Sequence, residues 1–272
     1  MKLPFFEPSD DPGASFTDLV AAIGSVPGQS SAAPATSAPL DESLMPPHGT
    51  TCCAIRFDGG VVIAGDRRAT SGNLISHRDI EKVFATDRHS SVAIAGAAGP
   101  AVEMVRLFQL QLEHYENVEG RSLSLDGKAN QLSQMLRSNL PMAMQGMAVV
   151  PIFAGFDLRR DIGRLFQFDV TGGRYEERDY AVTGSGMLHA GTVIKVGWHN
   201  DQGRDDAVDL AIEALYQAAD SDSASGLPDF LREIYPVVAT ITEAGYERVS
   251  DEELAGRYET LIAGLRERGI PS

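Results

Sequence analysis

Apolar and polar positions divide the chain into short strands and amphipathic helices. Cys53, Ile55 and Phe57 alternate with neighbouring positions, and Asp58-Gly59 then offers the favoured tight hairpin turn. The run 61–64 that follows is fully apolar. We therefore predict two paired strands at this point of the chain.

A second apolar run, 92–95, leads into the glycine-rich stretch 96–99, and Pro100 fits the first turn of a helix. That helix carries an apolar stripe on one face, formed by Ala101, Met104, Val105, Phe108, Leu112 and Tyr115. Similar patterns predict strands near 147–156, 165–170, 180–183 and 237–242, and helices near 128–140, 187–196, 206–219 and 254–265. Strands and helices thus come in blocks rather than in βαβ alternation. This order favours packed antiparallel sheets with helix pairs outside.

The first 49 residues differ in composition from the rest. Eight of the fourteen prolines lie before Thr50, and 30–39 is a Ser/Ala/Pro tract typical of a linker. A short stripe could form two amphipathic turns that dock on a partner: Phe16, Leu19, Val20 and Ile23. The start has one base, Lys2, and no apolar core of a secretory signal. We predict a dispensable leader, 1–49, before one domain, 50–272.

Charge and cysteine usage exclude several classes of function. The net charge is −15, of which the leader supplies −5, and basic clusters are lacking, which argues against nucleic-acid binding. No run of 18 apolar residues exists, so no membrane span is expected. Cys52 and Cys53 are adjacent and suit neither a disulfide nor a metal site. We expect two buried thiols in a cytoplasmic protein, without metal or cofactor.

Candidate catalytic residues lie where the leader ends. A threonine can act as a nucleophile when its own free α-amine accepts the hydroxyl proton. Thr50 meets this condition if the chain is cut after Gly49, and Asp66 and Lys82 follow 16 and 32 positions later. A cation near Thr50 favours loss of the hydroxyl proton, and Asp66 can hold that cation. Each residue also has an ordinary interpretation, as a turn residue or a surface charge.

Together, Gly49-Thr50-Thr51, the stretch 65–70 and Lys82 resemble the catalytic β subunit of the 20S proteasome, most closely the actinobacterial form. The resemblance implies an α+β fold of the N-terminal-nucleophile hydrolases, a four-layer αββα sandwich of two antiparallel sheets flanked by helices. It also implies that 1–49 is a propeptide removed by autocleavage. The expected activity is that of a threonine endopeptidase that degrades unfolded or tagged proteins.

The resemblance assigns further roles. Gly96 becomes the oxyanion-hole residue, and Ser185, Asp222 and Ser225 are expected to hydrogen-bond the terminal amine. Without the resemblance, the stretches 184–186 and 222–226 would be interpreted as helix caps and loops. The substrate pocket is expected to prefer an apolar side chain before the cleaved bond and to be formed by Ala69, Thr70, Ile80, Phe84, Ile94, Ala98 and Val102.

The expected partners are separate α subunits and other β subunits in an α7β7β7α7 barrel, with an ATPase ring that delivers proteins tagged by a ubiquitin-like protein. Three alternatives stay open: a heat-shock-type threonine protease subunit, a non-catalytic ring subunit, and an amidohydrolase for a small metabolite. The intact set of Thr50, Asp66, Lys82 and Gly96 argues against the ring subunit without activity.

Overall fold

The computed structural model describes residues 49–71 and 74–269. One sheet of five antiparallel strands contains the predicted hairpin, with β1 at an inner position next to β2. Its strands, in spatial order, are β10 (Tyr180–Gly184), β1 (Thr51–Phe57), β2 (Gly60–Gly65), β11 (Val237–Thr242) and β12 (Gly245–Arg248).

A second antiparallel sheet also has five strands, and a separate two-stranded hairpin follows β2 in the chain. The second sheet runs in the order β5 (Val83–Asp87), β6 (Ser90–Gly96), β7 (Val149–Asp157), β8 (Ile162–Phe168) and β9 (Arg174–Glu177). The hairpin consists of β3 (Ala69–Ser71) and β4 (Leu74–His77).

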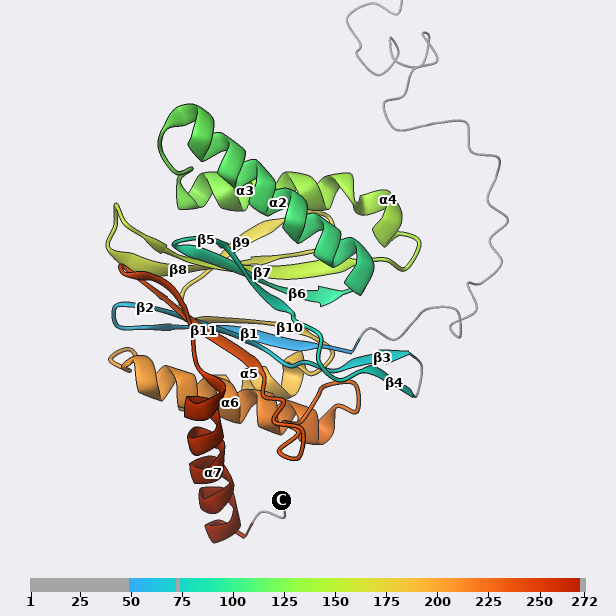
Figure 1. Cartoon of the computed structure of the whole chain (residues 1–272), viewed down its shortest axis with the longest axis vertical. Helices are drawn as coiled ribbons and strands as arrows, with labels where there is room; N and C mark the ends of the chain where they lie inside the picture. The colour runs from blue at the N-terminus through green and yellow to red at the C-terminus, as the bar shows by residue number, and fades with distance from the viewer. Residues whose placement is uncertain (1–48, 72–73, 270–272) are drawn as a thin grey trace, which may run out of the picture. The chain divides into compact units, whose positions relative to one another are not determined.

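Helices cover the outer faces of both sheets (Figure 1). The second sheet lies beneath α2 (Ala98–Glu119) and α3 (Leu125–Ser138), with the short α4 (Leu140–Ala143) after them. The first sheet lies against α5 (Met187–Gly197) and α6 (Arg204–Ser221), and α7 (Asp251–Glu267) closes the chain. The predicted four-layer αββα sandwich is confirmed.

Three apolar cores hold these layers together. One lies between the two sheets, one under α2 and α3, and one under α5 and α6. The predicted stripe on α2 faces its core, with five of its six residues buried and Tyr115 half-buried. Cys52 packs between the sheets, whereas Cys53 packs under α6, because adjacent strand residues point to opposite faces. Both are free and buried, as predicted.

The structure adds elements that the sequence pattern did not predict, namely β3, β4, β5, β9, β12 and α4. These strands are short, and β4 is exposed along its whole length, so apolar alternation is weak or absent there. Leu140 belongs to α4 rather than to the helix before it. The Phe16–Ile23 stripe lies outside the described residues. In the part of the chain that is described, no helix is long and apolar enough to cross a membrane.

Candidate active site

Thr50 lies directly before β1, and its peptide bond to Gly49 is intact. The Thr50 hydroxyl donates to the Gly49 carbonyl oxygen over 2.7 Å. The Lys82 ammonium donates to the same oxygen over 3.3 Å. Both residues are buried, with exposures of 4 % for Thr50 and 5 % for Lys82. The hydroxyl and the ammonium thus meet at the carbonyl whose cleavage would release the leader.

Asp66 holds the Lys82 ammonium from the other side. The Lys82 Nζ–Asp66 Oδ1 distance is 2.7 Å, and Asp66 is only 1 % exposed. Backbone N–H groups of Thr51, Arg68 and Gly226 also donate to this carboxylate, over 2.8–3.0 Å. A buried charge needs such partners, so these four donors fix Asp66 and, through it, Lys82. The predicted contact between Asp66 and Lys82 is therefore present.

Gly96 ends β6, and its N–H lies on the β5 side of the strand. The N–H of Ile94 donates to the Lys82 carbonyl over 2.9 Å, on the β5 side of the strand. Because backbone N–H groups alternate along a strand, the Gly96 N–H faces that same side, where β5 has not yet begun. Gly96 has φ +110°, and a Cβ would lie 2.1 Å from the Ala148 carbonyl oxygen. Only glycine fits this position.

A polar network surrounds the backbone nitrogen of Thr50. The Thr50 N–H donates to Ser185 Oγ over 3.3 Å, and Ser185 Oγ donates to Asp222 Oδ2. Ser225 Oγ donates to the same carboxylate oxygen over 2.8 Å and also contacts the Thr51 hydroxyl. Of the three predicted residues, only Ser185 contacts the nitrogen directly. Asp222 acts through Ser185, and Ser225 acts through Asp222 and Thr51.

Glycines permit the close approach of these segments. A Cβ at Gly184, which has φ +99°, would lie 2.0 Å from the Thr50 carbonyl oxygen. A Cβ at Gly49 would lie 1.9 Å from the Ala224 Cβ. The loop after α6 therefore leaves no room for a side chain at position 49, and glycine is required there.

A cavity of about 410 Å³ opens beside Thr50, which we call the Thr50 cavity. Six of the seven predicted pocket residues line it, namely Ala69, Thr70, Ile80, Ile94, Ala98 and Val102. Phe84 does not, because it packs against the core under α2. The cavity wall also contains Met147, His77 and Glu81, which the sequence analysis missed. Glu81 is already paired with Arg248 over 2.8 Å.

Neither the neighbouring Cys52 thiol nor a metal cluster among the described residues competes with Thr50 at this site. Burial raises the pKa of the Cys52 thiol above its usual range, which keeps this fully buried neighbour protonated. Among residues 49–71 and 74–269, no group of three or more His, Cys, Asp or Glu side chains could hold a metal ion. Sequence reasoning also missed Thr51 and Gly226, although Thr51 lies within the Gly49-Thr50-Thr51 motif and Gly226 directly follows Ser225.

Comparison with known proteins adds an independent line of argument. Residues 47–228 match the sequence model of the proteasome subunit family. A protein named "Proteasome subunit beta" from Acidimicrobium ferrooxidans is 55 % identical over 271 residues, which cover 99 % of this chain and 96 % of that protein.

Two further proteins of the same name show similar likeness. The one from Streptomyces griseus is 57 % identical over 79 % of this chain and 76 % of its own length. The one from Jonesia denitrificans is 50 % identical over 92 % of this chain and 82 % of its own length. The chain therefore belongs to the proteasome subunit family, as one of its β subunits.

Proposed function

We propose that this β subunit is a threonine-type endopeptidase that removes its own leader, residues 1–49, and then cleaves peptides with Thr50 as nucleophile. The observation that carries the proposal is the convergence of the Thr50 hydroxyl and the Lys82 ammonium on the Gly49 carbonyl oxygen. If Thr50 were only structural, nothing would explain a buried cation at the Gly49 carbonyl oxygen, since burying a charge is costly. An inactive ring subunit has no need of this arrangement.

Leader removal follows from these contacts. Thr50 Oγ attacks the Gly49 carbonyl carbon, the negative charge develops on the oxygen, and the Lys82 ammonium stabilises it. The C–N bond then breaks as the proton lost by the hydroxyl passes to the Thr50 nitrogen, which leaves an ester between the Gly49 carbonyl carbon and Thr50 Oγ and a free α-amine on Thr50. Water then hydrolyses the ester, which releases the leader with a carboxylate at Gly49 and regenerates the Thr50 hydroxyl beside the α-amine.

In the processed enzyme, the α-amine acts as the base. Its ordinary pKa of about 7.7–8.0 leaves a useful neutral fraction near neutral pH. The amine takes the hydroxyl proton as Oγ attacks the substrate carbonyl, and the Gly96 N–H donates to the developing oxyanion. The amine passes its proton to the leaving nitrogen, and water then hydrolyses the acyl ester. Ser185 and Asp222 hold the amine in place.

The Thr50 cavity supports a preference for an apolar side chain before the cleaved bond. The six predicted lining residues carry no charge, and the charged wall residues Glu81 and Lys82 are already paired with Arg248 and Asp66. Burying an apolar side chain contributes about 1.5–3 kcal/mol, whereas an unpaired charge would cost several kcal/mol. We propose cleavage after leucine, phenylalanine or tyrosine.

Membership of the family implies assembly with other subunits into a proteasome complex. We propose the α7β7β7α7 arrangement, with this chain in the inner rings, an ATPase ring as activator and proteins tagged by a ubiquitin-like protein as substrates. The two free thiols, Cys52 and Cys53, suit the reducing conditions of the cytoplasm. The native mass of the purified particle tests the arrangement, and a small oligomer would contradict it.

The decisive experiment is Thr50→Ala in the assembled particle. We expect the leader to stay attached and peptidase activity to vanish together, because one hydroxyl performs both reactions. Thr192→Ala is a matched control, since Gly191-Thr192 on α5 repeats the dipeptide away from the site. Intact mass measures processing, and fluorogenic peptides measure activity. A Thr50→Ala chain still cut after Gly49 would show that another protease does the trimming.

A further inference from the structure

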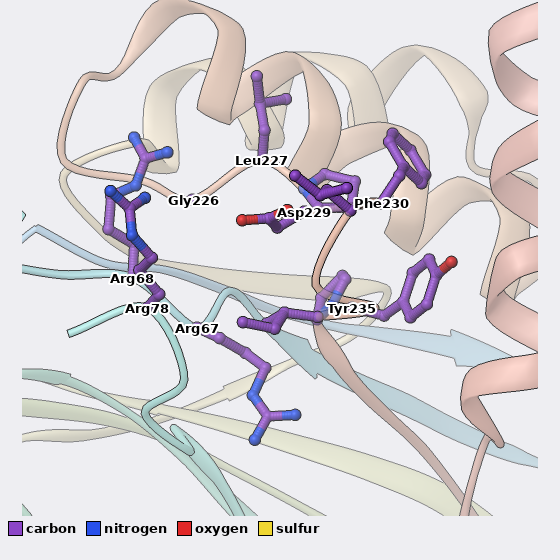
Figure 2. A pocket seen from close by; sticks show the side chains of 12 residues that line it. Arg67, Arg68, Arg78, Gly226, Leu227, Asp229, Phe230 and Tyr235 are labelled. Carbon is purple, nitrogen blue, oxygen red and sulfur yellow. The ribbon is translucent and has the colours of Figure 1, made fainter.

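A second cavity, of about 310 Å³, lies between the segment after β2 and the loop after α6 (Figure 2). We call it the arginine cavity, because three arginines contribute to its wall: Arg67, Arg68 and Arg78. The other side is mostly apolar and includes Leu227, Phe230 and Tyr235. In Figure 2, Arg68 and Arg78 lie on the same side, and the Asp229 carboxylate lies across from them.

The arginine cavity has surplus positive charge. Arg67 is paired with Asp79, and Asp229 is paired with Arg232 over 2.6 Å. Within residues 49–71 and 74–269, neither Arg68 nor Arg78 has a carboxylate at ion-pair distance. Two guanidinium groups thus keep donors for a carboxylate, although Arg68 also donates to the Ser223 carbonyl, in a chain whose net charge is −15.

Short contacts connect the arginine cavity to the nitrogen of Thr50. That nitrogen donates to Ser185, which donates to Asp222. The next residue, Ser223, accepts a hydrogen bond from the Arg68 guanidinium over 3.2 Å. The arginine cavity thus begins one residue beyond the group that holds the future α-amine.

This placement determines which part of a substrate can reach the arginines. The α-amine of Thr50 must hand its proton to the leaving nitrogen, so the leaving segment begins on the Ser185–Asp222 side. The acyl side chain enters the Thr50 cavity instead, next to Ala69. Arg68 and Ala69 are adjacent in the chain but line different cavities. The two cavities therefore serve the two sides of the cleaved bond.

We propose that the arginine cavity binds acidic side chains of the substrate on the C-terminal side of the cleaved bond. Arg68 and Arg78 bind the carboxylate, and the apolar wall accepts the neighbouring side chain. The inference rests on the threonine mechanism proposed above. The expected gain is about three- to tenfold for a charge-assisted hydrogen bond at a partly exposed site. It appears in kcat/KM, which includes acylation, whereas hydrolysis of the acyl ester is unaffected because the leaving segment has already departed.

The test uses the assembled, processed particle and internally quenched peptides with leucine before the cleaved bond. Aspartate is placed at the second, third or fourth position after that bond and is compared with asparagine at the same position. We expect a ratio of kcat/KM values, aspartate over asparagine, of about three to ten at one of these positions. The ratio should approach one in Arg78→Gln and Arg68→Gln, and in wild type at high salt.

Because the aspartate-to-asparagine ratio compares two peptides on the same enzyme, a general loss of activity in a variant does not change it. Arg178→Gln is the matched control, because it removes the same charge from an 82 % exposed side chain and should keep the wild-type ratio. A ratio of one in wild type at all three positions overturns the proposal, as does an unchanged ratio in both arginine variants. Hydrolysis of a leucine-coumarin substrate, which has no peptide leaving segment, tests the threonine mechanism separately.

Discussion

Replacing Asp66 by Asn probes the buried pair at the base of the site. Asp66 and Lys82 are 1 % and 5 % exposed, and the substitution removes the charge that faces the ammonium. It also places an amide N–H₂ where a carboxylate oxygen now accepts backbone N–H groups. Breaking a buried pair in this way costs about 3–5 kcal/mol. For a domain of this size, that lowers the unfolding temperature by about 6–20 °C.

Lys82→Met should cost less, about 1–3 kcal/mol, because Asp66 keeps its three backbone donors. Asp66→Asn, in contrast, leaves the ammonium with the Gly49 carbonyl as its remaining partner within the described site. The double variant, Asp66→Asn with Lys82→Met, contains no unpaired ammonium, so its stability should lie closer to that of Lys82→Met. Leader removal should fail in all three.

Thermal unfolding of assembled particles with identical partner subunits measures the stability order, and intact mass measures leader removal. Thr192→Ala again serves as the control for both. The reasoning is wrong if Lys82→Met unfolds at or below the temperature of Asp66→Asn. It is also wrong if the double variant is the least stable of the three, or if Lys82→Met still removes its leader at the wild-type rate.

Four further predictions concern processing, specificity, assembly and the thiols. Gly49→Ala should slow leader removal at least tenfold, because the new Cβ overlaps Ala224, and Ala224→Gly should restore part of the rate; intact mass over time decides this. Fluorogenic peptides with leucine before the cleaved bond should turn over at least about tenfold faster than those with arginine or glutamate, and the reverse order would mean that the cavity is misassigned. Synthesis of the chain without residues 2–49 should alter the rate of particle formation on native gels; equal rates would limit the leader to covering Thr50. Burial raises the pKa of Cys53 to about 12 and that of Cys52 above its usual range, so both thiols stay protonated at pH 8; iodoacetamide should label them only on unfolding, and labelling of the native particle would contradict their burial.

Local sequence patterns predicted the elements whose apolar side chains are buried. The stripe on α2 faces a single core, whereas the apolar residues of β1 and β2 are buried on both faces of the sheet. The pattern missed β4 and β9, whose side chains are mostly exposed. The family resemblance, in turn, assigned Phe84 to the substrate pocket, although the strand geometry of β5 directs that ring to the core under α2.

The site itself depends on contacts that local patterns do not contain. Gly226 donates to Asp66 across 160 positions, and Ser225 reaches Thr51 across 174. Sequence spacing indicated Asp66 and Lys82 through resemblance, but nothing local indicated Ala224 as the residue that excludes a side chain at Gly49. Such contacts arise from sheet order and from the path of the loop after α6, and both are set by the whole fold.

Cutting the chain after Gly49 would create a terminus that cannot fray. New ends usually gain freedom, but Thr51 is paired with Gly184 in β10, and its N–H is bound by Asp66. The new N-terminal residue, Thr50, is thus bonded directly to Thr51, which is fixed in a five-stranded sheet. One additional residue between Thr50 and Thr51 would move the hydroxyl by about 3.3 Å and turn it to the other face of the strand. The nucleophile therefore has a position fixed by strand register, and the fold tolerates no spacer there.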